Sequence, residues 1–230
     1  RLPVARAVRG AVGGAGAGEG NVISGNSLSG VAIDAGAGNA VRGNIIGLNP
    51  TRGLNAGNGT YGVALFGNTS GTGISDNVIA ANTAWGIAAF GNSSGAVIER
   101  NVIGLRGGSN TANDNTAAGN GQGGIDIESA DNQVAAGNRI AANNGPGVLI
   151  SGESADRNRI AGNVIGLSAG NDLRPNNNRG VYVRLGADDN IIGGSVVADR
   201  NTISGNGTGG VYVTDAATTG TVVRLNYIGT

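Results

Sequence analysis

The sequence predicts an all-β solenoid of about seven or eight coils, each built from three short strands. Three observations support this prediction. An asparagine-anchored motif recurs along the chain, short segments with alternating apolar residues follow it, and 46 of the 230 residues are glycine, which suits frequent turns. Repeats of this kind are typical of stacked architectures, in which each unit contacts only its neighbours.

The recurring motif is an asparagine followed two positions later by isoleucine. It takes two alternating forms, of which "NVISGN" (21–26) and "NIIGL" (44–48) are examples. The short units span 23–25 residues, and an insertion lengthens every second unit, so alternate coils are expected to carry long loops. The eight anchors are Asn21, Asn44, Asn77, Asn101, Asn138, Asn163, Asn201 and Asn226.

A second motif follows each of the first seven anchors: a glycine and then apolar residues at alternate positions, as in "GVALF" (62–66) and "GVYVT" (210–214). Alternation over so few residues is a strand pattern and not a helix pattern. A third apolar position usually lies three residues before the next anchor, as at Val41 and Ile74. The units leave no room for a crossover helix, so each strand is expected to pair in parallel with its counterpart one coil later.

The anchors are predicted to form an internal asparagine ladder. Asparagine tolerates left-handed backbone geometry at a tight bend and hydrogen-bonds locally. Coils in such a stack lie about 4.8 Å apart. Each side-chain amide can therefore bond the asparagine of the neighbouring coil, which satisfies polar groups that would be costly if buried alone. We expect a structural role for the eight anchors rather than ligand contact.

Composition excludes several functional classes. The formal charge is zero, which argues against nucleic acid or an anionic membrane as a partner. Without His or Cys the chain has no Ser-His-Asp triad, no thiol nucleophile and no zinc site of the usual kind, so no metal site is predicted. No apolar run is long enough to span a bilayer. Because Met is absent, the chain is expected to be a processed product or a segment of a longer one.

These units resemble the repeats of right-handed parallel β-helix proteins, a superfamily shape shared by pectate lyases, polygalacturonases, phage tailspikes and bacterial surface proteins. More narrowly, "GNVISGN" followed by "GV", together with "GNxIGL", resembles a repeat of very long bacterial extracellular proteins. The resemblance covers about residues 19–230 and implies a right-handed parallel β-helix located outside a bacterial cell or on its surface. It implies no single activity, because β-helices carry many unrelated functions.

The two ends of the chain differ from its middle. Residues 1–20 are less regular and are predicted to form an irregular first coil or a cap. Residues 21–230 are predicted to form the β-helix. A terminal coil exposes strand edges unless a polar cap covers them. No cap is recognisable at "NYIGT" (226–230), so we expect an excerpt of a longer array, with ends able to associate with other copies.

Alternation within the glycine-led strands predicts two columns of outward-facing side chains. Insertions at 49–61, 106–123 and 168–179 each precede such a strand, so they are expected to emerge from one side and flank this strip. Alternatively, they lie where solenoids tolerate insertions. The first column is Ala32, Ala64, Ala88, Asp126, Leu149, Tyr182 and Tyr212, and the second is Asp34, Phe66, Phe90, Glu128, Ser151, Arg184 and Thr214.

Aromatic residues on this strip are the candidate binding residues. Exposed aromatic rings on a largely polar solenoid favour a binding role. Phe66 and Phe90 are predicted to stack across adjacent coils, and Trp85 to extend that group. Tyr182 and Tyr212 lie toward the other end of the strip. Such rings form a platform for sugars or shield a hydrophobic edge.

Asp126, Glu128 and Arg184 are the candidate catalytic residues. The two carboxylates share one strand face, and Arg184 lies two coils away, about 9.5 Å. Paired carboxylates can hydrolyse glycosides or bind Ca²⁺, and with an arginine base the set would resemble pectate lyases. The polygalacturonase acid motifs and the His/Tyr set of alginate epimerases are absent. The alternative is a solvated surface pair without a catalytic role.

The predicted function is a non-catalytic extracellular rod or adhesin that binds glycan weakly on this strip and needs no cofactor. One alternative is a polysaccharide lyase or glycoside hydrolase that uses the outward carboxylates, in the lyase case with Ca²⁺. A second alternative is a structural subunit that assembles into filaments through its open ends.

Overall fold

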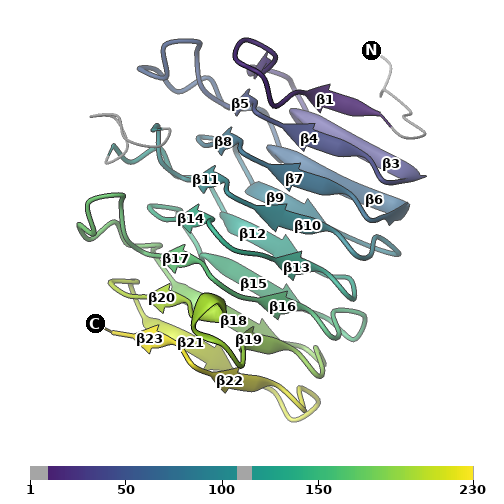
Figure 1. Ribbon diagram of the computed structural model, residues 1–230, viewed down its shortest axis with the longest axis vertical. Coiled ribbons are helices and arrows are strands. Elements are labelled where there is room, and N and C mark those ends of the chain that lie inside the picture. Colours follow the sequence, from purple (N-terminus) through teal and green to yellow (C-terminus); the bar gives the residue numbers. More distant parts are fainter. Residues whose placement is uncertain (1–9, 108–115, 230) are drawn as a thin grey trace.

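The computed structural model describes residues 10–107 and 116–229, which form a parallel β-helix (Figure 1). Every strand pair in its three sheets is parallel, as the repeat predicts. Seven coils of the described chain contribute a strand to each sheet, and an eighth contributes strands to two. A 3-10 turn lies at Val197–Asp199.

Sheet 1 contains the strand that precedes each anchor. Each of these strands is short because it buries a single inward apolar residue. Val41, Ile74 and Ile98 stack directly over one another and are fully buried. The strands are β1 (Ala11–Gly13), β4 (Ala40–Arg42), β7 (Gly73–Ser75), β10 (Val97–Glu99), β13 (Gln133–Val134), β16 (Arg159–Ile160), β19 (Ile191–Gly193) and β22 (Val222–Arg224).

Sheet 2 contains the two residues that follow each anchor. The isoleucine of the motif points inward, and Ile79, Ile103 and Ile140 form part of a continuous buried column. β-branched side chains pack well on such a pleated surface. The strands are β2 (Val22–Ile23), β5 (Ile45–Ile46), β8 (Val78–Ile79), β11 (Val102–Ile103), β14 (Arg139–Ile140), β17 (Val164–Ile165), β20 (Thr202–Ile203) and β23 (Tyr227–Ile228).

Sheet 3 contains the longer glycine-led strands, which present two inward apolar residues each. Ile125 and Ile127 of one coil lie beside Val148 and Ile150 of the next, and all four are fully buried. The strands are β3 (Val31–Ala37), β6 (Val63–Ser70), β9 (Trp85–Ala89), β12 (Gly123–Ile127), β15 (Val148–Ser151), β18 (Arg179–Arg184) and β21 (Gly209–Val213).

The anchor asparagines stack at the bend between sheets 1 and 2. The side-chain and backbone N–H groups of Asn77 both donate to Oδ1 of Asn101, at 2.9 and 3.0 Å, and Asn101 donates likewise to Asn138. Side-chain amide bonds of this kind run without a break from Asn21 to Asn226. Each coil is thus hydrogen-bonded to the next through its interior.

A second asparagine ladder lies at the bend between sheets 2 and 3. Its asparagines bond one another in the same way as the anchors do. In the long units, the insertion lies between the anchor and the asparagine of this second ladder. A shorter run at the bend between sheets 3 and 1 joins Asn132, Asn158 and Asn190. The second ladder consists of Asn26, Asn58, Asn82, Asn120, Asn143, Asn176 and Asn206.

The ends of the described chain continue the coil. β1 lies within the irregular segment 1–20 and pairs in register with β4, so residues 10–20 contribute to a first coil. At the other end the inward column is open to solvent, since Ile228 is 45% exposed whereas its neighbour Ile203 is fully buried.

Removing one rung from the ladder is expected to destabilise the fold. Asn101→Ala leaves the buried N–H groups of Asn77 without their acceptor and should lower the free energy of unfolding by about 3 kcal/mol. Urea unfolding followed by circular dichroism measures this. The matched control is Asn92→Ala, which removes an exposed amide that bonds only Asn68 and should cost little. Equal unfolding midpoints for the two variants would contradict an energetic role for the ladder.

Candidate functional site

The outer face of sheet 3 brings the candidate residues into one strip. Asp126 pairs with Ala88 of the preceding coil and Leu149 of the following one. Leu149 in turn pairs with Tyr182, and Tyr182 with Tyr212. The vertical order of the first outward column is therefore the one that the repeat predicts.

This column is much less exposed than alternation implies. Ala88 is fully buried, Asp126 is 5% exposed and Trp85, an expected exposed aromatic, is 8% exposed. The cause is a cluster of larger side chains around the small ones: Trp85 and Leu149 pack against Ala88 together with Phe90 and others. Of the five candidate rings expected to be exposed, Trp85 is buried, Phe66, Phe90 and Tyr182 are half-buried, and Tyr212, at 43%, is the most open.

Three aromatic rings meet at one end of the strip. Phe66 and Phe90 are stacked, with ring centroids 5.7 Å apart and an interplanar angle of 21°. Tyr61 packs edge-on against Phe90 at 5.3 Å and against Phe66 at 6.5 Å. Stacked and edge-to-face pairs are the favoured aromatic geometries. Both phenylalanines are half-buried, so part of each ring still faces solvent.

Tyr61 was not among the sequence-predicted site residues. It directly precedes Gly62, and Trp85 and Arg179 directly precede the equivalent glycines of their own coils. In the structure Trp85 pairs with Gly123 and Arg179 with Gly209, so this position forms a further column along the strip. The signal was present in the sequence as a large residue before the strand glycine.

Asp126 has the most perturbed carboxyl group in the strip. Burial, followed by the charge of Glu128, raises its pKa to about 7, and Arg184 partly opposes this shift. Its Oδ1 is buried without a hydrogen-bond partner, whereas Glu128 is exposed. Burial also raises the pKa of Tyr61, and the charges of Asp126 and Glu128 raise it further. The charges of Glu128 and Arg184 thus act on a buried carboxyl group whose pKa lies near neutral, and such perturbed groups are candidates for functional sites.

Two arginines and two tyrosines occupy the other end of the strip. The Tyr182 and Tyr212 rings lie 5.5 Å apart. Cζ of Arg179 is 4.7 Å from the Tyr182 centroid and 4.2 Å from that of Tyr212. Cζ of Arg184 lies 5.1 Å from the Tyr182 centroid. Two guanidinium groups therefore lie at this end, while Asp126 and Glu128 lie two coils away.

The three insertions leave sheet 2 on one side of the molecule, as the stacking of alternate long units predicts (Figure 1). Each begins as a short antiparallel hairpin. Residues 108–115 of the second insertion lie outside the described residues. The bridges that close the hairpins join Leu48 to Asn55, Leu105 to Ala117, and Leu167 to Leu173.

The described parts of the first two hairpins pack on sheet 2 rather than on the strip. Leu48 and Ala118 pack against Val78 on the outer face of sheet 2. Arg106 of the second hairpin donates to Oδ1 of Asn55 in the first, at 2.7 Å. The outward apolar residues of sheet 2 give the hairpins a surface to bury, which explains the difference from expectation. Tyr61, at the end of the first insertion, does reach the strip.

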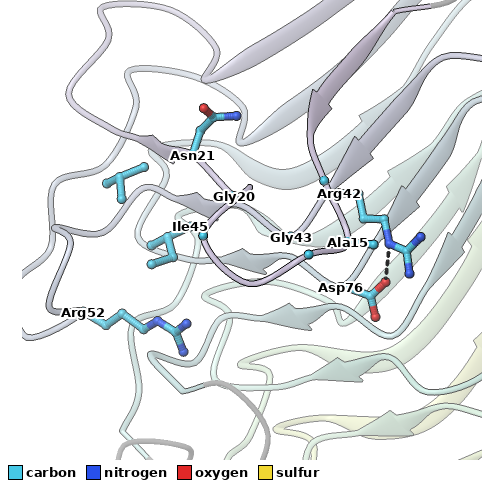
Figure 2. A pocket seen from close by; sticks show the side chains of 12 residues that line it. Ala15, Gly20, Asn21, Arg42, Gly43, Ile45, Arg52 and Asp76 are labelled. Carbon is cyan, nitrogen blue, oxygen red and sulfur yellow. Dashed lines mark hydrogen bonds and ion pairs between the residues drawn. The ribbon is translucent and has the colours of Figure 1, made fainter.

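A hollow of about 410 Å³ lies elsewhere, beside the first coil (Figure 2). Glycine-rich backbone, Arg42, Arg52 and Asp76 line it. Asp76 already bonds Arg42 at 3.1 Å and Arg100 at 2.8 Å, and the Arg100 guanidinium holds the pKa of Asp76 below its usual value. These ion pairs join neighbouring coils at this corner. Compared with the hollow, the strip on sheet 3 has the larger set of aromatic and charged groups.

The described residues offer neither a clustered metal site nor a membrane-spanning helix. In residues 10–107 and 116–229, no group of three or more acidic side chains lies close enough to hold a metal ion. Within the same ranges, no helix has the length and apolar character needed to cross a membrane.

Solved structures with a similar fold include two of the periplasmic alginate epimerase AlgG. A double mutant has a TM-score of 0.56 at 17% sequence identity, and the parent protein has 0.53 at 16%. The A-module of a mannuronan C-5 epimerase from Azotobacter vinelandii has 0.49 at 15%, with 86% of this chain and 61% of that one covered. The AlgG matches cover 86% of this chain and 47% of theirs, so the chain spans about half the length of AlgG.

No curated protein sequence matches the chain. A family model described as "Right handed beta helix region" matches residues 56–228, which is most of the sequence. It confirms the fold that the asparagine anchors and glycine-led strands predict. With its three parallel sheets and its laddered interior, the chain belongs to the right-handed β-helix family.

Proposed function

We propose that the chain is a polysaccharide-binding β-helix module that works outside a bacterial cell or on its surface. The observation that carries the proposal is the strip on sheet 3, where partly exposed aromatic rings adjoin carboxyl and guanidinium groups on a rigid support. Sugar rings pack their C–H faces on aromatic rings, and their hydroxyl groups bond carboxylates and guanidinium groups.

The shape of the strip supports a long ligand rather than a small one. Ring groups occur at both ends, around Phe66 and Phe90 and around Tyr182 and Tyr212, with Asp126 and Glu128 between them. A chain molecule can contact all three groups at once. AlgG shares the fold and its name describes a periplasmic enzyme of alginate, which makes polysaccharides the first class of ligand to test.

Removing a ring from the strip is expected to weaken polysaccharide binding. Phe90→Ala eliminates the ring that stacks on Phe66 and packs edge-on against Tyr61. It should lower affinity about fivefold or more, since aromatic contacts contribute about 1 kcal/mol or more. Affinity electrophoresis in gels containing cell-wall polysaccharides measures this. Tyr227→Ala is the matched control, because Tyr227 is an exposed aromatic on sheet 2. Unchanged mobility of the wild-type chain in every polysaccharide would refute the proposal.

A second candidate function is a polysaccharide lyase or glycoside hydrolase, and the buried Asp126 favours it. A carboxyl group with a pKa near 7 is suited to general acid or base work at neutral pH. In a lyase, the carboxylate form would take the proton from the carbon next to an acidic sugar's carboxylate, whose negative charge Arg184 stabilises. A carbon–carbon double bond then forms as the neighbouring glycosidic C–O bond breaks, and the leaving oxygen takes a proton from water. In a hydrolase, the acid form would protonate the leaving oxygen and Glu128 would activate water.

Activity on acidic polysaccharides distinguishes this candidate from simple binding. The wild-type chain is incubated with them in the presence and absence of Ca²⁺, and unsaturated products and new reducing ends are followed. If the candidate is right, Asp126→Asn and Glu128→Gln should each lower turnover at least about 100-fold, the usual contribution of a general acid or base. Full activity in the double variant would rule out these residues as catalysts.

The pH dependence of stability tests the protonation state of Asp126 without an activity assay. Its pKa is raised from about 3.8 to about 7 on folding, so the folded chain binds the proton more tightly than the unfolded chain. The resulting stabilisation is complete below pH 4 and is lost as the pH rises through 7, by about 2–4 kcal/mol. Asp126→Asn should therefore gain stability over wild type at pH 8 but not at pH 4 in urea unfolding. A parallel pH dependence in the two chains would contradict the shift.

A further inference from the structure

The basic end of the strip has features that general glycan binding does not explain. Arg179, Tyr182, Arg184 and Tyr212 lie together on the last two coils of sheet 3, and we refer to them as the arginine–tyrosine patch. The two tyrosine rings are tilted 49° to each other with centroids 5.5 Å apart. Arg179 lies against both rings, and Arg184 lies against Tyr182.

The guanidinium of Arg179 is held in place by its neighbour. Its Nη1 donates to Oδ1 of Asn178 at 2.7 Å, and the same oxygen accepts from the backbone N–H of Arg179 and from the Thr208 hydroxyl. This neutral amide fixes the position of the group without cancelling its charge. The remaining N–H groups of Arg179 lie beside the half-buried Tyr182 and the exposed Tyr212, within reach of a ligand.

Arg184 also keeps its charge available. Its Nε is buried and has no hydrogen-bond partner. No ion pair among residues 10–107 and 116–229 involves Arg184 or Arg179. Asp126 feels the charge of Arg184 through space but makes no bond to it. A guanidinium that is partly desolvated on an aromatic ring and lacks a counter-ion is well suited to bind an external anion.

We propose that the arginine–tyrosine patch is a subsite for an acidic sugar residue, and that the polysaccharide bound by the strip is anionic. The anionic group, a carboxylate or a sulfate ester, accepts hydrogen bonds from Arg179 and Arg184, and the sugar ring packs against Tyr212. Planar guanidinium groups bind such oxyanions through paired N–H donors. This inference rests on the proposed binding function and specifies its ligand class.

The distribution of charge along the strip favours a polysaccharide over a nucleic acid. Two coils from the patch, Glu128 presents an exposed carboxylate on the same face, and the carboxyl group of Asp126 lies buried in the strand beside it. Sugar hydroxyl groups can donate to Glu128 while an acidic residue meets the arginines. A nucleic acid carries a phosphate on every nucleotide and would bring negative charge against Glu128, on a chain with no net positive charge.

Binding of matched acidic and neutral oligosaccharides tests the inference. The acidic probes are oligogalacturonate, oligomannuronate and sulfated dextran, and the neutral ones are methyl-esterified oligogalacturonate, mannan oligosaccharide and plain dextran. Affinities are measured by titration calorimetry at low and high salt for wild type, Arg179→Gln, Arg184→Gln and the control Arg224→Gln. Arg224 is exposed on sheet 1, so its substitution removes the same charge from another face. Thermal melts confirm that each variant is folded.

At least one acidic probe should bind about tenfold or more tightly than its neutral counterpart, and salt should reduce the difference. Arg179→Gln or Arg184→Gln should remove that difference, whereas Arg224→Gln should leave it. The uronate and sulfate arms identify which anion the subsite prefers. Equal affinity for acidic and neutral probes would overturn the inference but leave the binding function intact. If the wild-type chain binds no glycan, both the inference and the proposed binding function are refuted. If it binds single-stranded DNA more tightly than any glycan, the inference is overturned.

Discussion

The side-chain hydrogen bond between asparagines of successive coils is the interaction on which the rest of the structure depends. Each bond joins the same atoms one coil apart, so it permits a single vertical alignment of the strands on either side of the bend. Two continuous ladders, at two of the three bends, fix that alignment for all three sheets. A slip of one residue would reverse the inward and outward faces and bury the polar column.

The fold was predictable because this interaction leaves a visible trace. Each anchor is followed at a constant distance by an inward isoleucine, so the first ladder and sheet 2 can be read from spacing alone. The second ladder was harder to recognise, because an insertion of variable length separates Asn58, Asn120 and Asn176 from their anchors. Only the coordinates show that these asparagines return to the positions that Asn26 and Asn82 occupy in the short units.

The candidate site was predictable in its order but not in its environment. Alternation places Asp126 on the outer face, yet it gives no account of how side chains from adjacent coils cover it. Ala88 and Leu149, which flank Asp126 on the adjacent coils, pack in one cluster with Trp85. Trp85 occupies the position before the strand glycine, as Tyr61 and Arg179 do in their own coils. The raised pKa of Asp126 is a consequence of this burial, and no pattern confined to one strand contains it.

The interior of the coil constrains the residue at each position, whereas the exterior does not. Inside, equivalent positions must hold nearly the same residue in every coil, because each side chain packs on its own counterpart. Outside, the first column of sheet 3 changes from Ala88 through Asp126 and Leu149 to Tyr182, since nothing in the stack constrains it. The resulting strip is aromatic at one end, acidic at its centre and basic at the other end. In the proposed function, a chain molecule lying along it would meet different chemistry at each coil, so the rigid register of the interior would give the bound chain a direction.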